Sequence, residues 1–366
     1  MTTQPLILLA AGGTGGHLFP AEALAIELMK RGFRVRLATD SRALRYTGLF
    51  SRDTIDVVPS ETVRGRNPLS LARTGLMLAA GMAVALNLVR RLNPSAVIGF
   101  GGYPTLPPLI AARLLRVPGV IHEANAVLGR ANRFLSRRVS AIATSLPGVL
   151  DRDPELASKT TTVGMPLRPA ILAASGVKFA VPDATGPFRL LVTGGSQGAR
   201  VMADIVPGAI EKLEPSLWSR LVLTQQVREE DMARVRAVYD RLKINAELAP
   251  FFNDLPARLA ANHLIVSRSG AGTVSELAAI GRPSVLVPLP GSIDQDQFAN
   301  AGVLSQAHGA LRIPQSEFTS DRLAAEISAL AGEPSRLAAM AAAARTVGRL
   351  DAAERLADLV VKVAGI

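Results

Sequence analysis

A glycine-rich segment near the start of the chain has the composition of an anion-binding loop. Gly12–Gly16 contains four glycines around Thr14, and His17 follows directly. Glycine lets backbone N–H groups approach a ligand closely, and a helix N-terminus favours negative charge. The segment is not a Walker loop, because no Gly-Lys-Ser/Thr follows. It is not a dinucleotide fingerprint, because Leu18 replaces the third glycine. It predicts contact with a phosphate or sugar, with a tight strand-to-helix turn as the alternative.

His17 carries a side chain that can act as a general base. The partial positive charge at a helix N-terminus disfavours the imidazolium form, and a neutral imidazole can accept a proton. The alternative is a structural histidine that caps the helix or lies in the core. The residue types alone leave both interpretations open.

Two further loops of the first half are expected to follow strands. Gly99–Pro104 reads Gly-Phe-Gly-Gly-Tyr-Pro, which favours either close backbone approach to a ligand or a plain turn. His122 ends the next predicted strand and Glu123 follows it, and a structural polar network is a reasonable interpretation for both. Asn125 lies further into that loop and is the better candidate for ligand contact.

The second half repeats the pattern of strand, glycine loop and helix. Gly194–Gly198 follows an apolar run and contains the hydroxyl of Ser196. The segment Ser267–Glu276 also leaves a predicted strand and enters a helix. Glu276 either completes a capping box with Thr273 or accepts hydrogen bonds from a ribose diol, and one carboxylate serves only one of these roles.

The sequence gives little support for a metal site. The chain has no cysteine, and its four histidines lack metal-ligand spacing. Asp294 and Asp296 form the Asp-x-Asp pattern that chelates a metal in some sugar transferases. Asp151 and Asp153 form the same pattern, which arises often by chance. We therefore predict no metal and no other cofactor.

The elements that must position these loops follow from the hydrophobic pattern. Apolar runs alternate with helical patterns, and in the first half they lie at 6–11, 34–39, 96–100, 119–122 and 142–144. This order is typical of a parallel sheet with helices on both faces. The first helix is expected to begin near Pro20. The same order restarts at Phe188.

These patterns predict an α/β fold with two Rossmann-like domains. We expect an N-terminal domain at 1–164 and a C-terminal domain at 165–347, with a terminal helix at about 348–366 that packs back on the first domain. Ligands bind at the carboxyl ends of parallel strands, so the glycine loops of both domains are expected to line one cleft.

The positive charge lies almost entirely in the first half. Residues 1–165 carry 20 basic and 10 acidic side chains, which accounts for +10 of the net charge of +11. Such an excess indicates an anionic partner, and nucleic acid, an anionic membrane and a phosphorylated substrate are the candidates. Aromatic residues make up 4% of the chain and no nucleic-acid motif is present, which argues against nucleic acid.

Within this positively charged half, the arginines gather between Glu61 and Arg138, a segment called the basic region here. An apolar helix that starts at Pro68 lies inside it. Burial in the core is one interpretation, and docking on anionic lipid is the other. The longest apolar stretch, Thr74–Val89, is shorter than the ~20 residues that span a bilayer.

The ordered set of motifs resembles the MurG family, the lipid I N-acetylglucosaminyltransferases of peptidoglycan synthesis, over essentially the whole chain. The motifs are Gly12–Ala21, Gly99–Tyr103, His122–Asn125, Gly194–Arg200 and Ser267–Glu276. The chain departs from the family pattern at Ala124, Met165 and Asp296, so we expect no side-chain role at those positions.

The resemblance implies an inverting glycosyltransferase with the GT-B fold, two Rossmann-like domains facing across a cleft. It would move N-acetylglucosamine from UDP-N-acetylglucosamine to the muramyl 4-hydroxyl of lipid I and so form lipid II. A UDP-N-acetylglucosamine 2-epimerase of the same fold is the alternative. A nicotinamide oxidoreductase lacks support because the dinucleotide fingerprint is missing, and a nonenzymatic membrane binder would leave the glycine loops unexplained.

The same resemblance implies roles for individual residues, with His17 as the base. The expected donor contacts are Thr14, Gly15, Gly16, Asn125, Arg168, Ser196, Phe252, Ala271, Glu276 and Gln297. The expected contacts to the acceptor and its pyrophosphate are Gly13, Gly101, Gly102 and Tyr103. The enzyme would act without a metal as a peripheral protein on the cytoplasmic face of the bacterial inner membrane, with proteins of cell-wall synthesis or division as candidate partners.

Overall fold

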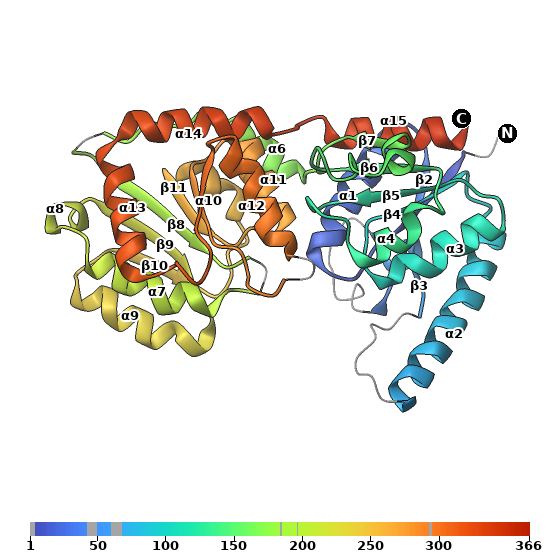
Figure 1. The fold of residues 1–366 in the computed structure, drawn as a ribbon, viewed down its shortest axis with the longest axis horizontal. Helices are drawn as coiled ribbons and strands as arrows, with labels where there is room; N and C mark the ends of the chain where they lie inside the picture. The colour runs from blue at the N-terminus through green and yellow to red at the C-terminus, as the bar shows by residue number, and fades with distance from the viewer. Residues whose placement is uncertain (1–3, 42–49, 60–67, 184, 196, 293–294) are drawn as a thin grey trace. The chain divides into compact units, whose positions relative to one another are not determined.

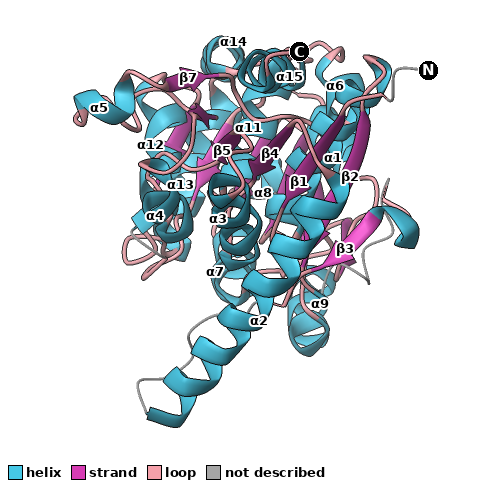
Figure 2. Ribbon diagram, turned by 90° about the vertical axis from the view of Figure 1, so that its right-hand side faces the viewer, coloured by secondary structure: helices cyan, strands magenta, loops and turns pink. Residues whose placement is uncertain are grey.

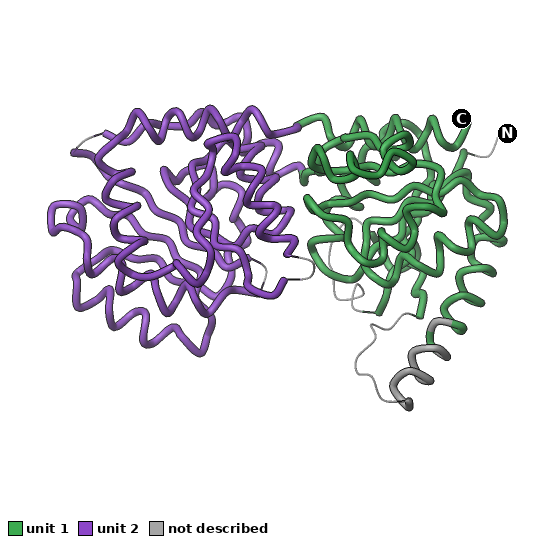
Figure 3. Tube along the Cα trace, viewed as in Figure 1, with its two compact units in different colours: residues 1–168, 350–366 green, residues 169–349 purple. Residues whose placement is uncertain are grey.

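The chain divides into two compact units, which Figure 3 distinguishes by colour. The computed structural model describes residues 4–41, 50–59, 68–183, 185–195, 197–292 and 295–366. The first unit comprises Met1–Arg168 and Leu350–Ile366, and the second comprises Pro169–Arg349. The division thus falls after Arg168, whereas the sequence pattern predicted a boundary after residue 164.

The described part of the first unit contains a seven-stranded parallel sheet in the order β3-β2-β1-β4-β5-β6-β7. Its strands are β1 (Leu6–Ala10), β2 (Arg34–Thr39), β3 (Ile55–Val57), β4 (Ala96–Gly99), β5 (Gly119–Glu123), β6 (Ala141–Thr144) and β7 (Thr160–Thr162). Its helices are α1 (Gly15–Lys30), α2 (Pro68–Leu92), α3 (Leu106–Leu114), α4 (Arg130–Ser136), α5 (Pro154–Ala157) and α15 (Ala352–Ala364), with short 3-10 helices at Arg52–Thr54 and Tyr103–Thr105.

Helices cover both faces of this sheet, which explains why every residue of the central strand β1 is buried. On one face Ile7 and Leu9 pack with α1 and with Leu356 and Val360 of α15. The C-terminal helix is therefore part of the core of the first unit, and Figure 1 shows it in red beside α1. The opposite face packs against α2, α3 and α4, as Figure 2 shows.

The apolar helix of the basic region is α2. In its second half Ala85, Leu88 and Val89 are buried against the sheet, so the core interpretation holds there. Residues 60–67, which include part of the basic region, lie outside the described residues.

Helix α1 begins at Gly15, and the expectation that it begins near Pro20 was wrong. The carbonyl of Thr14 accepts hydrogen bonds from the N–H groups of His17 (3.0 Å) and Leu18 (2.9 Å), so the first helical turn is already formed there. Pro20 lies inside the helix, and His17 belongs to its first turn.

The described part of the second unit contains a six-stranded parallel sheet in the order β10-β9-β8-β11-β12-β13. Its strands are β8 (Phe188–Thr193), β9 (Leu221–Gln226), β10 (Ala246–Ala249), β11 (Leu264–Ser267), β12 (Ser284–Leu286) and β13 (Ala310–Arg312). Its helices are α6 (Pro169–Ser175), α7 (Arg200–Glu211), α8 (Pro215–Trp218), α9 (Met232–Arg241), α10 (Leu255–Ala261), α11 (Ala271–Ile280), α12 (Asp296–Gln306), α13 (Ser320–Gly332) and α14 (Pro334–Val347), with a short 3-10 helix at Glu229–Asp231.

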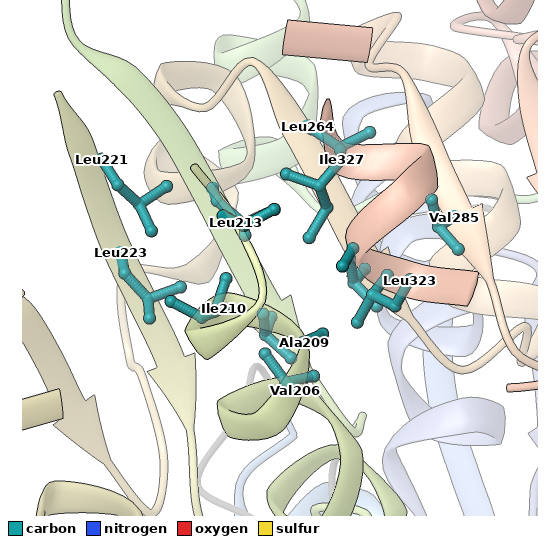
Figure 4. Close-up of a cluster of buried hydrophobic side chains, with 14 of the residues drawn as sticks. Val206, Ala209, Ile210, Leu213, Leu221, Leu223, Leu264, Val285, Leu323 and Ile327 are labelled. Atoms are coloured by element: carbon teal, nitrogen blue, oxygen red, sulfur yellow. The ribbon is translucent and has the colours of Figure 1, made fainter. Parts of the chain in front are cut away.

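The core of the second unit joins α7 and α13 to the sheet. Figure 4 shows the side chains that meet there, which include Val206, Ala209, Ile210, Leu221, Leu223, Leu264, Val285, Leu323 and Ile327. Burial of these side chains against one another anchors α7, so the loop that precedes it is held at both ends.

Both sheets reverse their strand order at one point, between β1 and β4 in the first unit and between β8 and β11 in the second. In open α/β sheets, ligands bind beyond the carboxyl ends of the strands at such a switch point. The glycine loops after β1, β4, β8 and β11 all stand there. The fold therefore places the sequence-predicted loops where doubly wound sheets bind ligands.

Candidate active site

The two loops at the switch point of the first unit are joined through their backbones. The N–H of Gly12 donates to the carbonyl of Gly101 at 3.3 Å. Gly101 and Gly102 have φ angles of +90° and +81°, a conformation that glycine adopts without strain. The plain-turn interpretation of the second loop is therefore incomplete, because its glycines also form one surface with the first loop.

The imidazole of His17 packs on three of these glycines. A Cβ on Gly12 would lie 2.9 Å from Cδ2 of the ring. A Cβ on Gly101 would lie 3.3 Å from Cε1, and one on Gly102 would lie 3.4 Å from Nε2. The ring occupies space that side chains at these three positions would otherwise fill. His17 itself is partly buried. Two of these glycines, Gly101 and Gly102, were predicted to contact the acceptor, and they lie against the candidate base although they are distant from it in sequence.

The N-terminus of α1 has the properties expected of an anion site. Thr14 is the exposed N-cap residue, and Gly15 and Gly16 begin the helix. Their N–H groups have no acceptor within the helix and carry its partial positive charge. Gly13 differs, because its N–H donates to the buried carboxylate of Asp40 at 3.2 Å. Sequence reasoning missed Asp40, although its place at the end of β2 puts it at the same sheet edge.

Glu123 forms the structural network that was considered for it. Its buried carboxylate accepts hydrogen bonds from the N–H of Asn125 (3.0 Å), from Nδ2 of Asn125 (3.1 Å), from the N–H of Gly129 (2.9 Å) and from Nδ2 of Asn132 (2.9 Å). Burial raises the pKa of Glu123, and these donors act in the opposite direction. The network shapes the loop after β5 and fixes the side chain of Asn125.

His122 is also structural, because it is fully buried and ties β5 to the segment that leaves the first unit. Its Nε2 lies 3.1 Å from the carbonyl of Gly164 and 3.2 Å from the hydroxyl of Ser145. A carbonyl can only accept, so Nε2 carries the proton. Burial lowers the pKa of His122 to about 4, with a smaller contribution from His17.

Two other predicted residues of the first unit have defined surroundings. Arg168 places its guanidinium carbon 4.1 Å from the ring centre of Phe19, which belongs to α1. Arg168 is thus positioned beside the helix that starts at Gly15. Tyr103 begins the short 3-10 helix after Gly102, whose carbonyl accepts a hydrogen bond from the Thr105 hydroxyl at 2.7 Å.

In the second unit, the loop Gly194–Gly198 is held by two residues that sequence reasoning missed. Gln226 accepts a hydrogen bond from the N–H of Gly194 at 3.0 Å. Arg228 donates to the carbonyls of Gln197 (3.2 Å) and Gly198 (3.0 Å). Both residues lie at or just beyond the end of β9, next to β8, and that position was the available signal. Ser196 lies outside the described residues.

Helix α11 begins at Ala271, and its N-cap is Gly270. Thr273 is therefore the third residue of the helix and Glu276 the sixth, beyond the first turn. The capping-box alternative for Glu276 is wrong, because the Gly270 carbonyl already accepts the N–H of Val274 at 3.0 Å. Glu276 is partly buried and stays a candidate for ligand contact.

Gln297 is brought to the loop that precedes α11. Its carbonyl accepts a hydrogen bond from the Ser269 hydroxyl at 2.8 Å, and Nδ2 of Asn300 donates to the Ser269 carbonyl at 3.3 Å. The side chain of Gln297 accepts the N–H of Leu289 at 3.0 Å. The starts of α11 and α12 are thereby joined through Ser269.

Phe252 follows β10, and its ring is buried under the guanidinium of Arg258, 4.4 Å from the ring centre. Arg258 is itself fixed by Glu247 and Asp254. A ligand at this loop would therefore meet the backbone of Phe252 and not its ring.

Within the described residues, no group of three or more His, Cys, Asp or Glu side chains is placed to hold a metal ion. Asp294 of the Asp-x-Asp pattern lies outside this set. The helices that are described do not include one with the length and apolarity needed to cross a membrane.

Comparison with known proteins identifies the family. Residues 7–144 match the glycosyltransferase family 28 N-terminal domain, and residues 189–356 match the glycosyltransferase family 28 C-terminal domain. A protein of Nitrobacter hamburgensis is 80% identical over 364 residues, covering 100% of this chain and 98% of its own length. One of Bradyrhizobium diazoefficiens is 78% identical over 366 residues and the full length of both chains. The chain belongs to the MurG family of glycosyltransferase family 28.

Both of these relatives are named UDP-N-acetylglucosamine–N-acetylmuramyl-(pentapeptide) pyrophosphoryl-undecaprenol N-acetylglucosamine transferase. Among solved structures, Acinetobacter baumannii MurG is 29% identical, with a TM-score of 0.78 over 98% of this chain and 99% of that one. A UDP-N-acetylglucosamine 2-epimerase from Neisseria meningitidis has a TM-score of 0.68 over 98% of this chain and all of its own, but only 13% identity, so it shares the fold alone. The resemblance and the GT-B fold class predicted from the motifs are confirmed.

The substitution His122→Gln should remove a pH-dependent part of the stability. The unfolded histidine takes up a proton near pH 6.5, whereas the folded one stays neutral down to about pH 4. The unfolded state therefore binds more protons in this window, so the folded protein loses stability as the pH falls below 6.5. The loss is on the order of 2 kcal/mol between pH 6.5 and about pH 5.

Urea unfolding of both proteins between about pH 7 and pH 5 measures this effect. The free energy of unfolding of the original protein should decline toward that of the variant as the pH falls. A difference between them that stays constant across this range would contradict the buried neutral state of His122.

Proposed function

We propose that this chain transfers N-acetylglucosamine from UDP-N-acetylglucosamine to the muramyl 4-hydroxyl of lipid I, with inversion at the anomeric carbon, and so forms lipid II for peptidoglycan synthesis. The observation that carries the proposal is the full-length identity of 78% and 80% with relatives named for this reaction. The 2-epimerase alternative has only a likeness of fold in its favour.

His17 is the proposed general base. The muramyl 4-hydroxyl attacks C1 of the donor sugar while the imidazole takes its proton, and the bond from C1 to the UDP oxygen breaks with its electron pair on UDP. The glycines Gly12, Gly101 and Gly102 leave the space in which the imidazole packs, which supports its placement at the switch point of the first unit. General-base assistance of this kind contributes about 10²–10⁴ in rate.

Backbone N–H groups are the proposed means of stabilising the charge on the leaving UDP. The Gly194–Gly198 loop and the start of α11 at Ala271 point helix N-termini toward the switch point of the second unit. By family resemblance, Ser196 meets the donor, Glu276 the ribose, Gln297 the sugar and the Phe252 backbone the uracil. This arrangement would need no metal and no other cofactor.

Residues of the first unit complete the proposed substrate contacts. Thr14, Gly15, Gly16, Asn125 and Arg168 are assigned to the donor, and Gly13, Gly101, Gly102 and Tyr103 to the acceptor and its pyrophosphate. The shared surface of the two glycine loops supports this assignment. The N–H of Gly13 is engaged by Asp40, so a contact there would use other backbone atoms.

Lipid I is a membrane lipid, and we place the enzyme at the cytoplasmic face of the bacterial inner membrane as a peripheral protein. The surface of the first unit supports this placement. Leu114 is 63% exposed and Phe134 is 47% exposed, and Arg138 stacks on Phe134 at 4.0 Å. Arg113 donates to the carbonyl of Arg138, which joins the ends of α3 and α4. Exposed apolar side chains among arginines suit an anionic lipid surface. Cell-wall synthesis and division proteins are candidate partners.

The transfer reaction itself is the first test. Labelled UDP-N-acetylglucosamine and a lipid I analogue, incubated with the protein, should yield labelled lipid, with the same rate when EDTA is present. Epimerised sugar nucleotide formed without an acceptor would favour the epimerase instead. Loss of transfer with EDTA would contradict the metal-independent mechanism.

His17→Asn should lower turnover by about 10²–10⁴ while the affinity for UDP changes by less than about twofold, because the imidazole acts on the acceptor hydroxyl. The matched control is His308→Asn, an exposed histidine of the second unit with a φ of +63°, a conformation that asparagine tolerates. Unchanged turnover in the His17 variant would exclude it as the base.

Salt should weaken membrane association more than it weakens UDP binding. Vesicles containing phosphatidylglycerol should bind the protein at low ionic strength and release most of it at about 0.5 M NaCl, because screening acts on exposed charges. Vesicles of phosphatidylcholine alone are the control. Equal binding to both kinds of vesicle would contradict an electrostatic contribution from the arginines.

A further inference from the structure

Gln226 occupies a central position at the carboxyl edge of the second sheet. It is the last residue of β9, which lies between β8 and β10. Its side chain is buried, at 6% exposure. A buried amide needs partners for both its oxygen and its nitrogen, and Gln226 finds them in two different loops.

The oxygen of Gln226 holds the end of β8. Oε1 accepts hydrogen bonds from the hydroxyl of Thr193 at 2.9 Å and from the N–H of Gly194 at 3.0 Å. The Thr193 hydroxyl in turn lies 3.3 Å from the N–H of Gly195 and accepts its hydrogen bond. The first residues of the Gly194–Gly198 loop are therefore fixed by this one amide oxygen.

The nitrogen of Gln226 holds the loop after β10. Nε2 donates to the carbonyl of Pro250 at 3.1 Å, two residues before Phe252. The orientation of the amide is set by chemistry, since the N–H of Gly194 can only donate and the carbonyl of Pro250 can only accept. A shift of either loop would break a buried hydrogen bond to a rigid strand.

We propose that Gln226 is a positioning residue that holds two loops of the donor site at a fixed distance from each other, so that UDP contacts both at once. One is the Gly194–Gly198 loop, here called the diphosphate loop, and the other is the loop after β10 that contains Pro250 and Phe252, here called the uracil loop. This inference rests on the proposed function, which assigns the two loops to the two ends of the donor. Glutamine suits the position because one planar amide presents an acceptor and a donor on opposite sides. No residue type that only accepts or only donates could hold both loops.

Gln225, the preceding residue, provides a matched comparison. It is fully buried, but it lies on the other face of β9, where it accepts from the Tyr239 hydroxyl at 2.5 Å and donates to the Met202 carbonyl at 3.3 Å. Its partners belong to α9 and α7 and not to the donor loops. The same substitution at the two positions thus separates loop positioning from a general loss of stability.

Two variants release the two loops separately. Gln226→Glu keeps an acceptor for Gly194 but, at about pH 8 where the carboxyl group is ionised, cannot donate to Pro250. Thr193→Val removes the hydroxyl on the β8 side with little change of shape. Binding of uridine and of UDP is measured for each by calorimetry or competition, together with the KM for UDP-N-acetylglucosamine and kcat. Circular dichroism and thermal melting verify that each variant is folded.

We expect Gln226→Glu to lower the affinities for uridine and for UDP by about tenfold each, which is the effect of one buried hydrogen bond. It should also raise the KM for UDP-N-acetylglucosamine more than it lowers kcat. Thr193→Val should lower the affinity for UDP several-fold and the affinity for uridine by less than about twofold, because only the diphosphate loop loses its hydrogen bonds to the Thr193 hydroxyl. Gln225→Glu should lower the melting temperature but leave both affinities within about twofold.

The inference is overturned if Gln226→Glu binds uridine and UDP as tightly as the original protein, or if Gln225→Glu weakens binding as much. Should Gln226→Glu fail to fold, Thr193→Val decides, and unchanged UDP affinity in that variant also overturns the inference. A wild-type protein that binds no UDP at all would instead contradict the proposed function.

Discussion

Close packing of the His17 imidazole on glycine backbone shapes the switch point of the first unit. His17 occupies the space left by the missing side chains of Gly12, Gly101 and Gly102, and it does so from the first turn of α1. A methyl group at Gly12 would already contact the ring at 2.9 Å. The glycines therefore serve the placement of the imidazole.

Buried polar side chains set the shape of the loops around this arrangement. In the first unit, Glu123 gathers four donors and His122 ties β5 to Gly164. In the second unit, Gln226 at the end of β9 and Ser269 in the loop after β11 also hold loops through hydrogen bonds. Loops that contain many glycines have little intrinsic rigidity, so hydrogen bonds from side chains on the strands must supply it.

The net charge differs between the two halves of the chain. The second half of the chain is almost neutral, although it is the half assigned to a nucleotide diphosphate. Helix N-termini and backbone N–H groups can bind phosphate without formal charge. The first half is strongly basic, and Arg113 and Arg138 lie beside the exposed side chains of Leu114 and Phe134. Formal charge is found where the proposed partner is an extended anionic surface.

Hydrophobic periodicity and glycine spacing are local properties of the chain, so they were enough to predict the fold class, the paired glycine loops, the family and the set of candidate residues. The sequence misplaced the start of α1, left open the roles of His122 and Glu123 and the capping role of Glu276, and did not reveal Asp40, Gln226 or Arg228. Those outcomes depend on which side chains meet across strands that are distant in sequence. They became visible in the folded chain, because a hydrogen bond between Gln226 and Pro250, or an imidazole over Gly102, exists only once the parallel strands lie side by side.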